Sequence, residues 1–330
     1  MIERNAFIAG TAMAAPERIV PNAYFDELLG EDVGTWLVDN LTIRERRWLT
    51  EDESVADLCE EAARKALATA GVKPADLDLI VISTDTPEYI SPSTASVLQQ
   101  RLKATGAGTF DINTACAGFV TAVDMGAKYI RSDERYNNIL IIGAYGMSKY
   151  LNLEDKKTVT LFADGAGAVV LRSTTENRGW LAARLHTEGQ YAEWMGIYGG
   201  GTKNPISDSV LANHDNQLKF VKKFPKELNP TTWTRMVQEV VAEAGCTVED
   251  VSMAFFTQIN INSIRETMDN MGLPYDKTHT VMDRYGYTGS ACIPMALAES
   301  VELGKVKPGD LVVFMGSGGG LAFAAAAFRW

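Results

Sequence analysis

The stretch Asp111-Ile112-Asn113-Thr114-Ala115-Cys116-Ala117-Gly118-Phe119-Val120 joins the end of an expected buried strand to the start of an expected helix. Residues 117–130 carry apolar side chains at helical spacing, so we expect a helix that begins directly after Cys116. Unpaired backbone N–H groups and the helix dipole favour negative charge at such a turn. A thiol placed there tends to have a lowered pKa and to act as a nucleophile. From this stretch alone, a nucleophilic cysteine and a buried structural cysteine both remain open.

The composition of the whole chain narrows the function classes. Its 330 residues suffice for two domains or one large one, and 46% of them are hydrophobic. A net charge of −11 argues against a nucleic-acid-binding protein, because phosphate contacts need clustered basic residues. The cysteines are widely spread without a CxxC motif, so we expect reduced thiols and no metal site. Without a signal pattern or a membrane-length apolar run, the chain is expected to be soluble and cytoplasmic.

The second half of the chain repeats the order of the first. The expected buried strands are 79–83, 138–143, 253–257 and 311–315, and the expected helices include 54–70, 93–102, 232–244, 261–271 and 290–301. We also expect a glycine-rich hairpin over 158–171 and a short strand over 280–282. One constant offset relates Gly71 to Gly245 and Cys116 to Ser290. This register predicts an internal duplication, with α/β halves at 1–173 and 174–330 whose helix N-termini face a shared centre.

Three motifs carry a family resemblance that covers nearly the whole chain. They are Thr114-Ala-Cys116-Ala-Gly-Phe119, Phe162-Ala-Asp164-Gly-Ala-Gly167-Ala and Gly316-Ser-Gly318-Gly319-Gly320. Together they resemble ketoacyl-acyl-carrier-protein synthase III and its relatives in the thiolase superfamily. The resemblance implies an α/β fold of the thiolase type, a duplicated five-layered αβαβα arrangement. It also implies that Cys116 is the nucleophile and that Gly319 supplies an oxyanion-hole N–H.

The same resemblance implies a thioester substrate and no permanently bound cofactor. Trp36 and Arg44 lie in a segment similar to the one that contacts coenzyme A, and Lys156 stands where relatives carry an arginine. The expected partners are acyl-coenzyme A or an acyl carrier protein, whose phosphopantetheine arm carries the same thioester. The basic run Lys219, Lys222, Lys223 and Lys226 fits either a docking surface for an acidic carrier or a solvated face.

Two positions depart from the family pattern. The family uses a histidine and an asparagine to stabilise the enolate formed when a malonyl thioester loses carbon dioxide. Thr257 stands at the histidine position in Phe256-Thr-Gln-Ile-Asn260, and Tyr287 replaces the asparagine in Gly286-Tyr-Thr-Gly-Ser290. Losing one such donor typically costs ~10²–10³ in rate, so decarboxylating condensation is expected to be very slow. The three histidines His186, His214 and His279 are interpreted as structural.

The sequence therefore predicts an acyltransferase of the ketoacyl synthase III type that works through a Cys116 acyl-enzyme, in fatty-acid-like or specialised metabolism. The alternatives are a catalytically silent partner subunit of an active homologue and a decarboxylating synthase with atypical assisting residues. We expect a homodimer, because 138–143 and the loop 87–92 correspond to regions that relatives use for pairing. Tyr145, Met147, Tyr150 and Leu151 fit either an acyl channel or a subunit contact, and the sequence does not separate these two roles.

Overall fold

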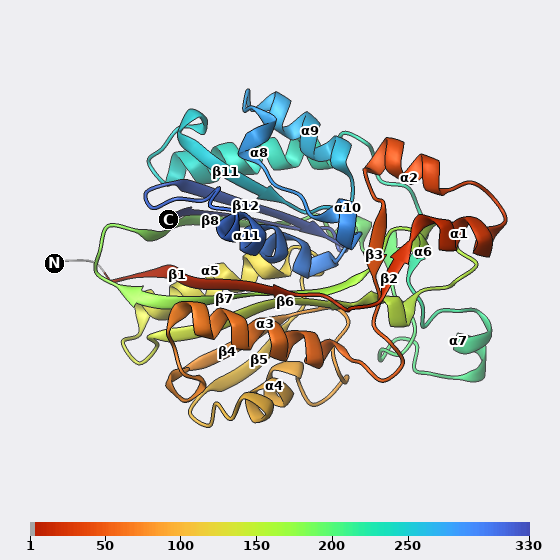
Figure 1. Cartoon of the computed structure of the whole chain (residues 1–330), viewed down its shortest axis with the longest axis horizontal. Helices are drawn as coiled ribbons and strands as arrows, with labels where there is room; N and C mark the ends of the chain where they lie inside the picture. Colours follow the sequence, from red (N-terminus) through yellow and green to blue (C-terminus); the bar gives the residue numbers. More distant parts are fainter. Residues whose placement is uncertain (1–3) are drawn as a thin grey trace.

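Two β-sheets, with helices between them and on their outer faces, form five layers in the structure, a computed structural model that describes residues 4–330 (Figure 1). The first sheet contains, in spatial order, β1 (Asn5–Ala14), β7 (Asp164–Thr174), β6 (Asn138–Gly146), β4 (Leu79–Ser83) and β5 (Gly108–Ile112). The second contains β11 (Val251–Phe256), β12 (Leu311–Gly318), β13 (Ala322–Arg329) and β8 (Gly179–Thr187). Strands β4, β5 and β6 run parallel, as do β11 and β12.

The helices complete the layers. Between the two sheets lie α5 (Gly118–Ser132) and α11 (Cys292–Glu302). The outer face of the first sheet is covered by α3 (Val55–Ala70) and α4 (Thr94–Leu102), and that of the second by α8 (Leu228–Glu243) and α9 (Ile261–Asn270). The central strands are buried on both faces and therefore consist of nearly continuous apolar residues. The expected α/β fold with an αβαβα arrangement is confirmed.

Local signals in the sequence explain where α3 begins and ends. Ser54 and Asp57 form a reciprocal capping box at its start, as the serine in the sequence indicated. Gly71 ends the helix in the left-handed conformation, with a φ of 64° that glycine adopts without strain.

Equivalent elements of the two parts keep the offset that was read from the sequence. Helix α5 starts at Gly118 and α11 starts at Cys292, two residues after Cys116 and Ser290 respectively. Ala115 and Gly289, which precede Cys116 and Ser290, both have a positive φ, of 46° and 49° respectively. Strand β7 runs to Thr174, so the first sheet extends to the proposed boundary between the halves.

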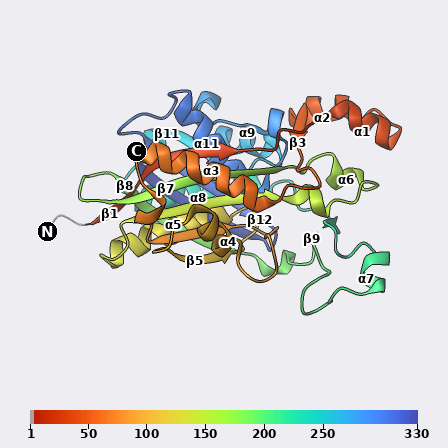
Figure 2. The same cartoon turned by 60° about the horizontal axis from the view of Figure 1, so that its bottom comes forward.

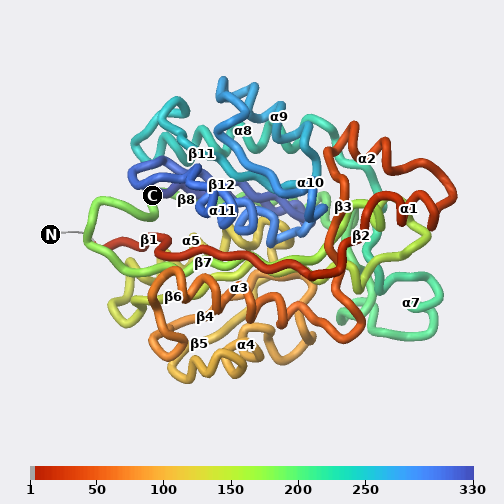
Figure 3. The backbone as a smooth tube through the Cα atoms, viewed as in Figure 1, coloured from red at the N-terminus to blue at the C-terminus, as the bar shows by residue number. Residues whose placement is uncertain are grey.

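Short elements gather at the end of the molecule away from the N-terminus (Figures 2 and 3). They include β2 (Ile19–Pro21), α1 (Asn22–Leu29), α2 (Gly34–Leu41), β3 (Glu45–Arg47), α6 (Lys156–Val159), β9 (Met195–Gly196), α7 (Asp208–Ala212), β10 (Lys219–Phe220) and α10 (Met282–Tyr285). Single 3₁₀ turns lie at Pro74–Asp76, Met147–Tyr150, Gly189–Tyr191, Val248–Asp250, Tyr275–Lys277 and Gly289–Ala291. No helix within residues 4–330 is long and apolar enough to cross a membrane.

Two expected elements are wrong. The segment 158–171 is not a hairpin, because α6 ends at Val159 and the glycines lie inside the single strand β7. These glycines serve close packing instead: a Cβ on Gly167 would lie 2.6 Å from Pro294 Cβ of α11. Residues 280–282 form no strand, because α10 begins at Met282.

Candidate active site

Cys116 lies on the turn between β5 and α5, where the sequence placed it. The turn is held against the first sheet, because a Cβ on Gly118 would lie 1.8 Å from Ser83 Oγ at the end of β4. The glycine loop between β12 and β13 covers it from the second sheet. A Cβ on Gly318 would lie 2.3 Å from the backbone nitrogen of Cys116, so glycine is required for this approach. Only 2% of the Cys116 surface is exposed, and the thiol is therefore enclosed by both sheets.

The expected low pKa of Cys116 is wrong. Burial raises the pKa of the thiol well above its ordinary value, and the negative charge of Asp85 raises it further. A hydrogen bond with the Tyr287 side chain acts in the opposite direction but does not outweigh burial. The helix-terminus argument fails here because it treats the turn as solvated, whereas the closed site penalises the thiolate.

Tyr287 is a residue whose side chain acts on the nucleophile. Its hydroxyl opposes the rise in the pKa of the Cys116 thiol, which is the effect expected of a donor to the thiolate sulfur. Two further aromatic rings surround it: the ring centroid of Phe162 lies at 5.3 Å and that of Tyr145 at 6.4 Å. All three rings are buried. Tyr287 therefore joins a packed aromatic wall to the reactive sulfur.

Thr257 has a different role from the one its position suggested. Its hydroxyl donates to Ser317 O at 3.2 Å and accepts from Ser317 N at 2.9 Å. Both interactions are buried and fix the strand that leads into the glycine loop. The only proton of this hydroxyl is committed to Ser317, so Thr257 holds the loop over Cys116 and has no free donor for a substrate oxygen.

Gly319 lies in the loop beside Cys116. A Cβ added to Gly319 would lie 3.4 Å from Met195 O and 3.9 Å from Ala115 Cβ. These contacts place Gly319 next to the residue that precedes the nucleophile. Its role as an oxyanion-hole donor stays a prediction.

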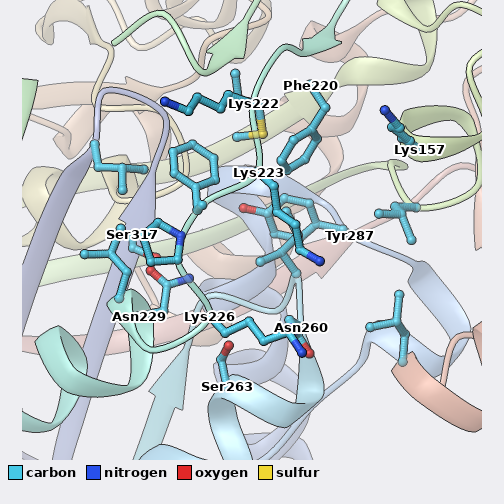
Figure 4. Close-up of a pocket in the computed structure, with 18 of the residues that line it drawn as sticks. Lys157, Phe220, Lys222, Lys223, Lys226, Asn229, Asn260, Ser263, Tyr287 and Ser317 are labelled. Carbon is cyan, nitrogen blue, oxygen red and sulfur yellow. The ribbon is translucent and has the colours of Figure 1, made fainter. Parts of the chain in front are cut away.

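A cavity of about 530 Å³ leads to this site (Figure 4). Tyr287, Ser317 and Gly318 line its inner part, next to Cys116. Trp36 and Lys156, two of the predicted coenzyme A contacts, also line it, although Lys156 is paired with Glu31 at 2.9 Å. Arg44, the third, is exposed and does not line the cavity in the described part of the chain.

Three members of the basic run line this cavity. They are Lys222, Lys223 and Lys226, which Figure 4 shows on one loop segment beside it, and the Lys222 amine lies 4.1 Å from the centroid of the Trp194 ring. Lys219, the fourth, instead pairs with Asp215 at 2.6 Å and lines a neighbouring cavity of about 290 Å³. The run is therefore not merely a solvated face, because most of it surrounds the cavity.

The histidines occupy other places. His279 Nε2 lies 2.7 Å from Glu299 Oε2, and its Nδ1 lies 3.0 Å from Lys305 Nζ. His186 lies 3.5 Å from Glu188, and His214 lines the smaller cavity. Among residues 4–330, no histidine lines the cavity that reaches Tyr287, and no cluster of three possible metal ligands occurs.

Sequence reasoning missed Asp85. It follows Thr84, the first residue after β4, and its charge acts on Cys116, Tyr145 and Tyr150. A signal was present, because carboxyl ends of neighbouring parallel strands meet at one edge of a sheet. β4 pairs in parallel with β5, which leads to Cys116, so a polar residue just after either strand was a candidate.

The layered fold, with the duplicated turn at its centre, is that of the thiolase superfamily. Models of the N- and C-terminal parts of 3-oxoacyl-[acyl-carrier-protein] synthase III match residues 110–189 and 241–330. A β-ketoacyl-[acyl-carrier-protein] synthase III from Clostridium perfringens is 37% identical over 98% of this chain and 99% of its own. The chain belongs to the 3-oxoacyl-[acyl-carrier-protein] synthase III family.

Solved structures agree with this assignment. The 3-oxoacyl-[acyl-carrier-protein] synthase III of Aquifex aeolicus is 32% identical, with a TM-score of 0.88 over 98% of this chain and 100% of that one. The priming β-ketosynthase of the R1128 polyketide biosynthetic pathway is 26% identical, with a TM-score of 0.88 over 98% of this chain and 96% of that one.

Proposed function

We propose that this chain transfers an acyl group from a coenzyme A or carrier-protein thioester to Cys116 and then to an acceptor. The observation that carries the proposal is that Tyr287 and Gly318 both line the cavity and both adjoin Cys116, Tyr287 through its effect on the pKa of the thiol and Gly318 through its close approach to the backbone nitrogen. A thioester arm in the cavity thus delivers its carbonyl to the sulfur. The Cys116 sulfur–carbon bond forms, the thioester carbon–sulfur bond breaks, and the thiol proton leaves with the departing thiol.

The expected oxyanion hole supports this step. The glycine loop lies close to the backbone nitrogen of Cys116. We propose that the N–H groups of Cys116 and Gly319 stabilise the negatively charged oxygen of the tetrahedral intermediate. No permanently bound cofactor is needed for such a transfer. The names of the relatives support fatty-acid biosynthesis as the setting, and the priming ketosynthase supports specialised metabolism as a second one.

Decarboxylating condensation is the alternative that the family suggests, and Thr257 and Tyr287 oppose it. We propose that they replace the assisting histidine and asparagine. Thr257 has its hydroxyl proton on Ser317, so of these two side chains only Tyr287 can donate to an enolate oxygen. The negative charge of Asp85 near Cys116 further disfavours a developing anion. The silent-partner alternative is disfavoured by Cys116 and the glycine loop packed against it, which a scaffold does not need.

The lysines offer a test of substrate binding. Changing Lys222, Lys223 and Lys226 together to glutamine is expected to raise KM for an acyl-coenzyme A about 10-fold at low salt, because phosphate groups at the cavity mouth lose their attraction. The effect should shrink as salt screens the charges. Steady-state kinetics at two ionic strengths measures it.

A matched control changes three exposed lysines away from the cavity, Lys73, Lys103 and Lys307, to glutamine. This variant alters the net charge equally but should keep KM within about twofold. Equal effects of the two triple changes would show that net charge alone matters, and the binding assignment would fail.

We also propose a homodimer, with a corrected contact. The predicted pairing strand 138–143 is β6, which lies inside the first sheet between β7 and β4 and cannot pair with another chain. The outer strand is β5. Gly108 N donates to Asp78 O and Ile112 O accepts from Thr84 N, so the main-chain groups of Thr109 face away from β4. The loop 87–92 lies between β4, the neighbour of β5, and α4, and it exposes Ile90 at 88%.

Sedimentation is expected to show a dimer at micromolar concentration. Thr109→Pro removes the outward N–H of β5 and should produce monomers, whereas Thr109→Val keeps this N–H and should remain dimeric. A monomeric wild-type protein would contradict the proposal. A dimeric Thr109→Pro variant would move the contact elsewhere.

A further inference from the structure

Asp85 emerges from the sheet at the same edge as the nucleophile. In the parallel pair β4 and β5, Ser83 lies opposite Ile112, and Thr84 N donates to Ile112 O at 3.1 Å. The chain leaves β4 through Thr84 into Asp85 and leaves β5 into the turn that carries Cys116, so both groups follow the same sheet edge. The negative charge of Asp85 raises the pKa of the Cys116 thiol, after the larger effect of burial.

The carboxyl of Asp85 is not satisfied within the protein. Its Oδ1 is buried and has no hydrogen-bond partner among residues 4–330, although the residue as a whole keeps partial exposure. Asp164, a second buried carboxylate near the site, shows the contrast: it accepts hydrogen bonds from Leu49 N at 2.7 Å and Ser148 N at 2.8 Å. Native proteins rarely leave such an oxygen unpaired, because desolvation costs free energy that only a partner returns.

The groups on which the charge of Asp85 acts are a thiol and two phenols. Its charge raises the pKa of Cys116, Tyr145 and Tyr150, in each case after the larger effect of burial. Burial also raises the pKa of Asp85 itself to about 6. None of these three groups supplies the Asp85 carboxylate with a positive charge.

Asp85 does not line the large cavity. Within the described chain, neither Asp85 nor Tyr145 nor Tyr150 is among its lining residues, whereas Tyr287 and Gly318 are. A thioester arm that fills the cavity brings its carbonyl to Cys116, so the acyl substituent must continue past the sulfur. It then enters the region of Asp85 and the tyrosines.

Resting on the proposed function, we infer that Asp85 is a specificity residue that accepts a hydrogen bond from a hydroxyl or ammonium group on a short acyl chain. The chain is short because the rings of Tyr145, Phe162 and Tyr287 already fill the region around the sulfur. Tyrosine faces also attract an ammonium group, so the wall suits a cation as well as a hydroxyl.

The test compares three coenzyme A thioesters of equal chain length: propionyl, 3-hydroxypropionyl and 3-aminopropionyl. The rate of Cys116 acylation is followed by rapid quenching and intact-mass analysis, in the wild type and in Asp85→Asn and Asp85→Leu. Rates are expressed as ratios to propionyl within each variant, so that any change in thiol reactivity cancels. The wild type is expected to favour at least one donor-bearing chain by about 10-fold or more.

Asp85→Leu should lose this preference, because it removes both charge and acceptor at similar volume. Asp85→Asn keeps an acceptor oxygen without charge. It should therefore retain a preference for the hydroxyl but lose one for the ammonium, which tells the two ligands apart. The matched control Asp52→Asn removes one exposed carboxylate and should keep the wild-type ratios.

Three outcomes overturn the inference. Ratios near one in the wild type, or ratios that Asp85→Leu leaves unchanged, show that Asp85 does not read the acyl chain. An equal loss of rate with all three thioesters in both Asp85 variants assigns it instead to proton transfer from Cys116. Absence of acylation with every thioester defeats the proposed function itself and is distinct from these results. Thermal unfolding of each variant shows whether it is folded.

Discussion

Cys116→Ala is expected to abolish covalent acylation, with a loss of turnover on the order of 10³-fold or more, because no other group can form the acyl-enzyme. Intact-mass analysis after incubation with a panel of acyl thioesters measures it: the wild type gains the mass of the acyl group and the variant does not. Cys292 provides the matched control. It is a second buried thiol whose charge influences Cys116, and Cys292→Ala should still be acylated.

A mass increase that persists in Cys116→Ala would place the acyl group on another residue. If no thioester labels the wild type, the silent-partner alternative is favoured instead. The two failures differ in the wild-type protein, so one experiment separates them.

The raised pKa of Cys116 gives this reaction a defined pH dependence. Because burial and Asp85 hold the pKa above its ordinary value, the thiolate is a small fraction at neutral pH and grows about tenfold with each pH unit. Alkylation by iodoacetamide should therefore accelerate from pH 7 to 9 without a plateau near neutrality. A plateau near pH 7 would instead indicate an activated thiolate, as the turn alone suggested.

The fold could be predicted from the sequence because the signals that indicate its strands and helix ends are local and repeated. A buried strand and a helix-closing glycine recur at one offset, and the structure shows the corresponding elements at these positions. The prediction of a hairpin over 158–171 was wrong because a glycine can serve either of two purposes. Glycine permits a turn, but Gly167 instead permits α11 to approach β7, and only the distance to Pro294 reveals this contact.

Only part of the candidate site could be predicted from the sequence. The position of Cys116 between strand and helix follows from local spacing, but its pKa depends on burial by the glycine loop from the other end of the chain. Thr257 shows the same limit. Its identity was informative, but its commitment to Ser317 is a contact between strands that no local pattern encodes. Asp85 was not predicted because it belongs to none of the three motifs, and its place beside Cys116 follows only from the pairing of β4 with β5.

Introducing a histidine at Thr257 and an asparagine at Tyr287 is expected to convert the chemistry. Thr257→His with Tyr287→Asn should raise carbon dioxide release from malonyl-coenzyme A on the order of 10²-fold or more, because both side chains would donate to the same enolate oxygen. The double change should exceed either single change for this reason. Headspace or coupled detection of carbon dioxide measures the rate.

This exchange also has a structural cost. Thr257→His loses both hydrogen bonds to Ser317, and Tyr287→Asn leaves space in a wall where Tyr287 is only 1% exposed. Losing a buried aromatic side chain typically lowers the free energy of unfolding by about 3–5 kcal/mol. Ile259 lines the cavity near the new imidazole and restricts its orientation. Changing both positions to leucine provides the control, because it loosens the loop and the wall without adding donors.

The unmodified protein decides what kind of enzyme this is. With Thr257 committed to Ser317 and Tyr287 as the single donor, it should acylate Cys116 while releasing little carbon dioxide from malonyl thioesters. Comparable gains in the leucine control would attribute decarboxylation to a loosened site rather than to restored donors. Release by the wild type at the rate of its acylation would mean that Tyr287 alone, with the glycine loop, stabilises the enolate. The chain would then be a decarboxylating synthase with atypical assisting residues, and the acyltransferase proposal would be wrong.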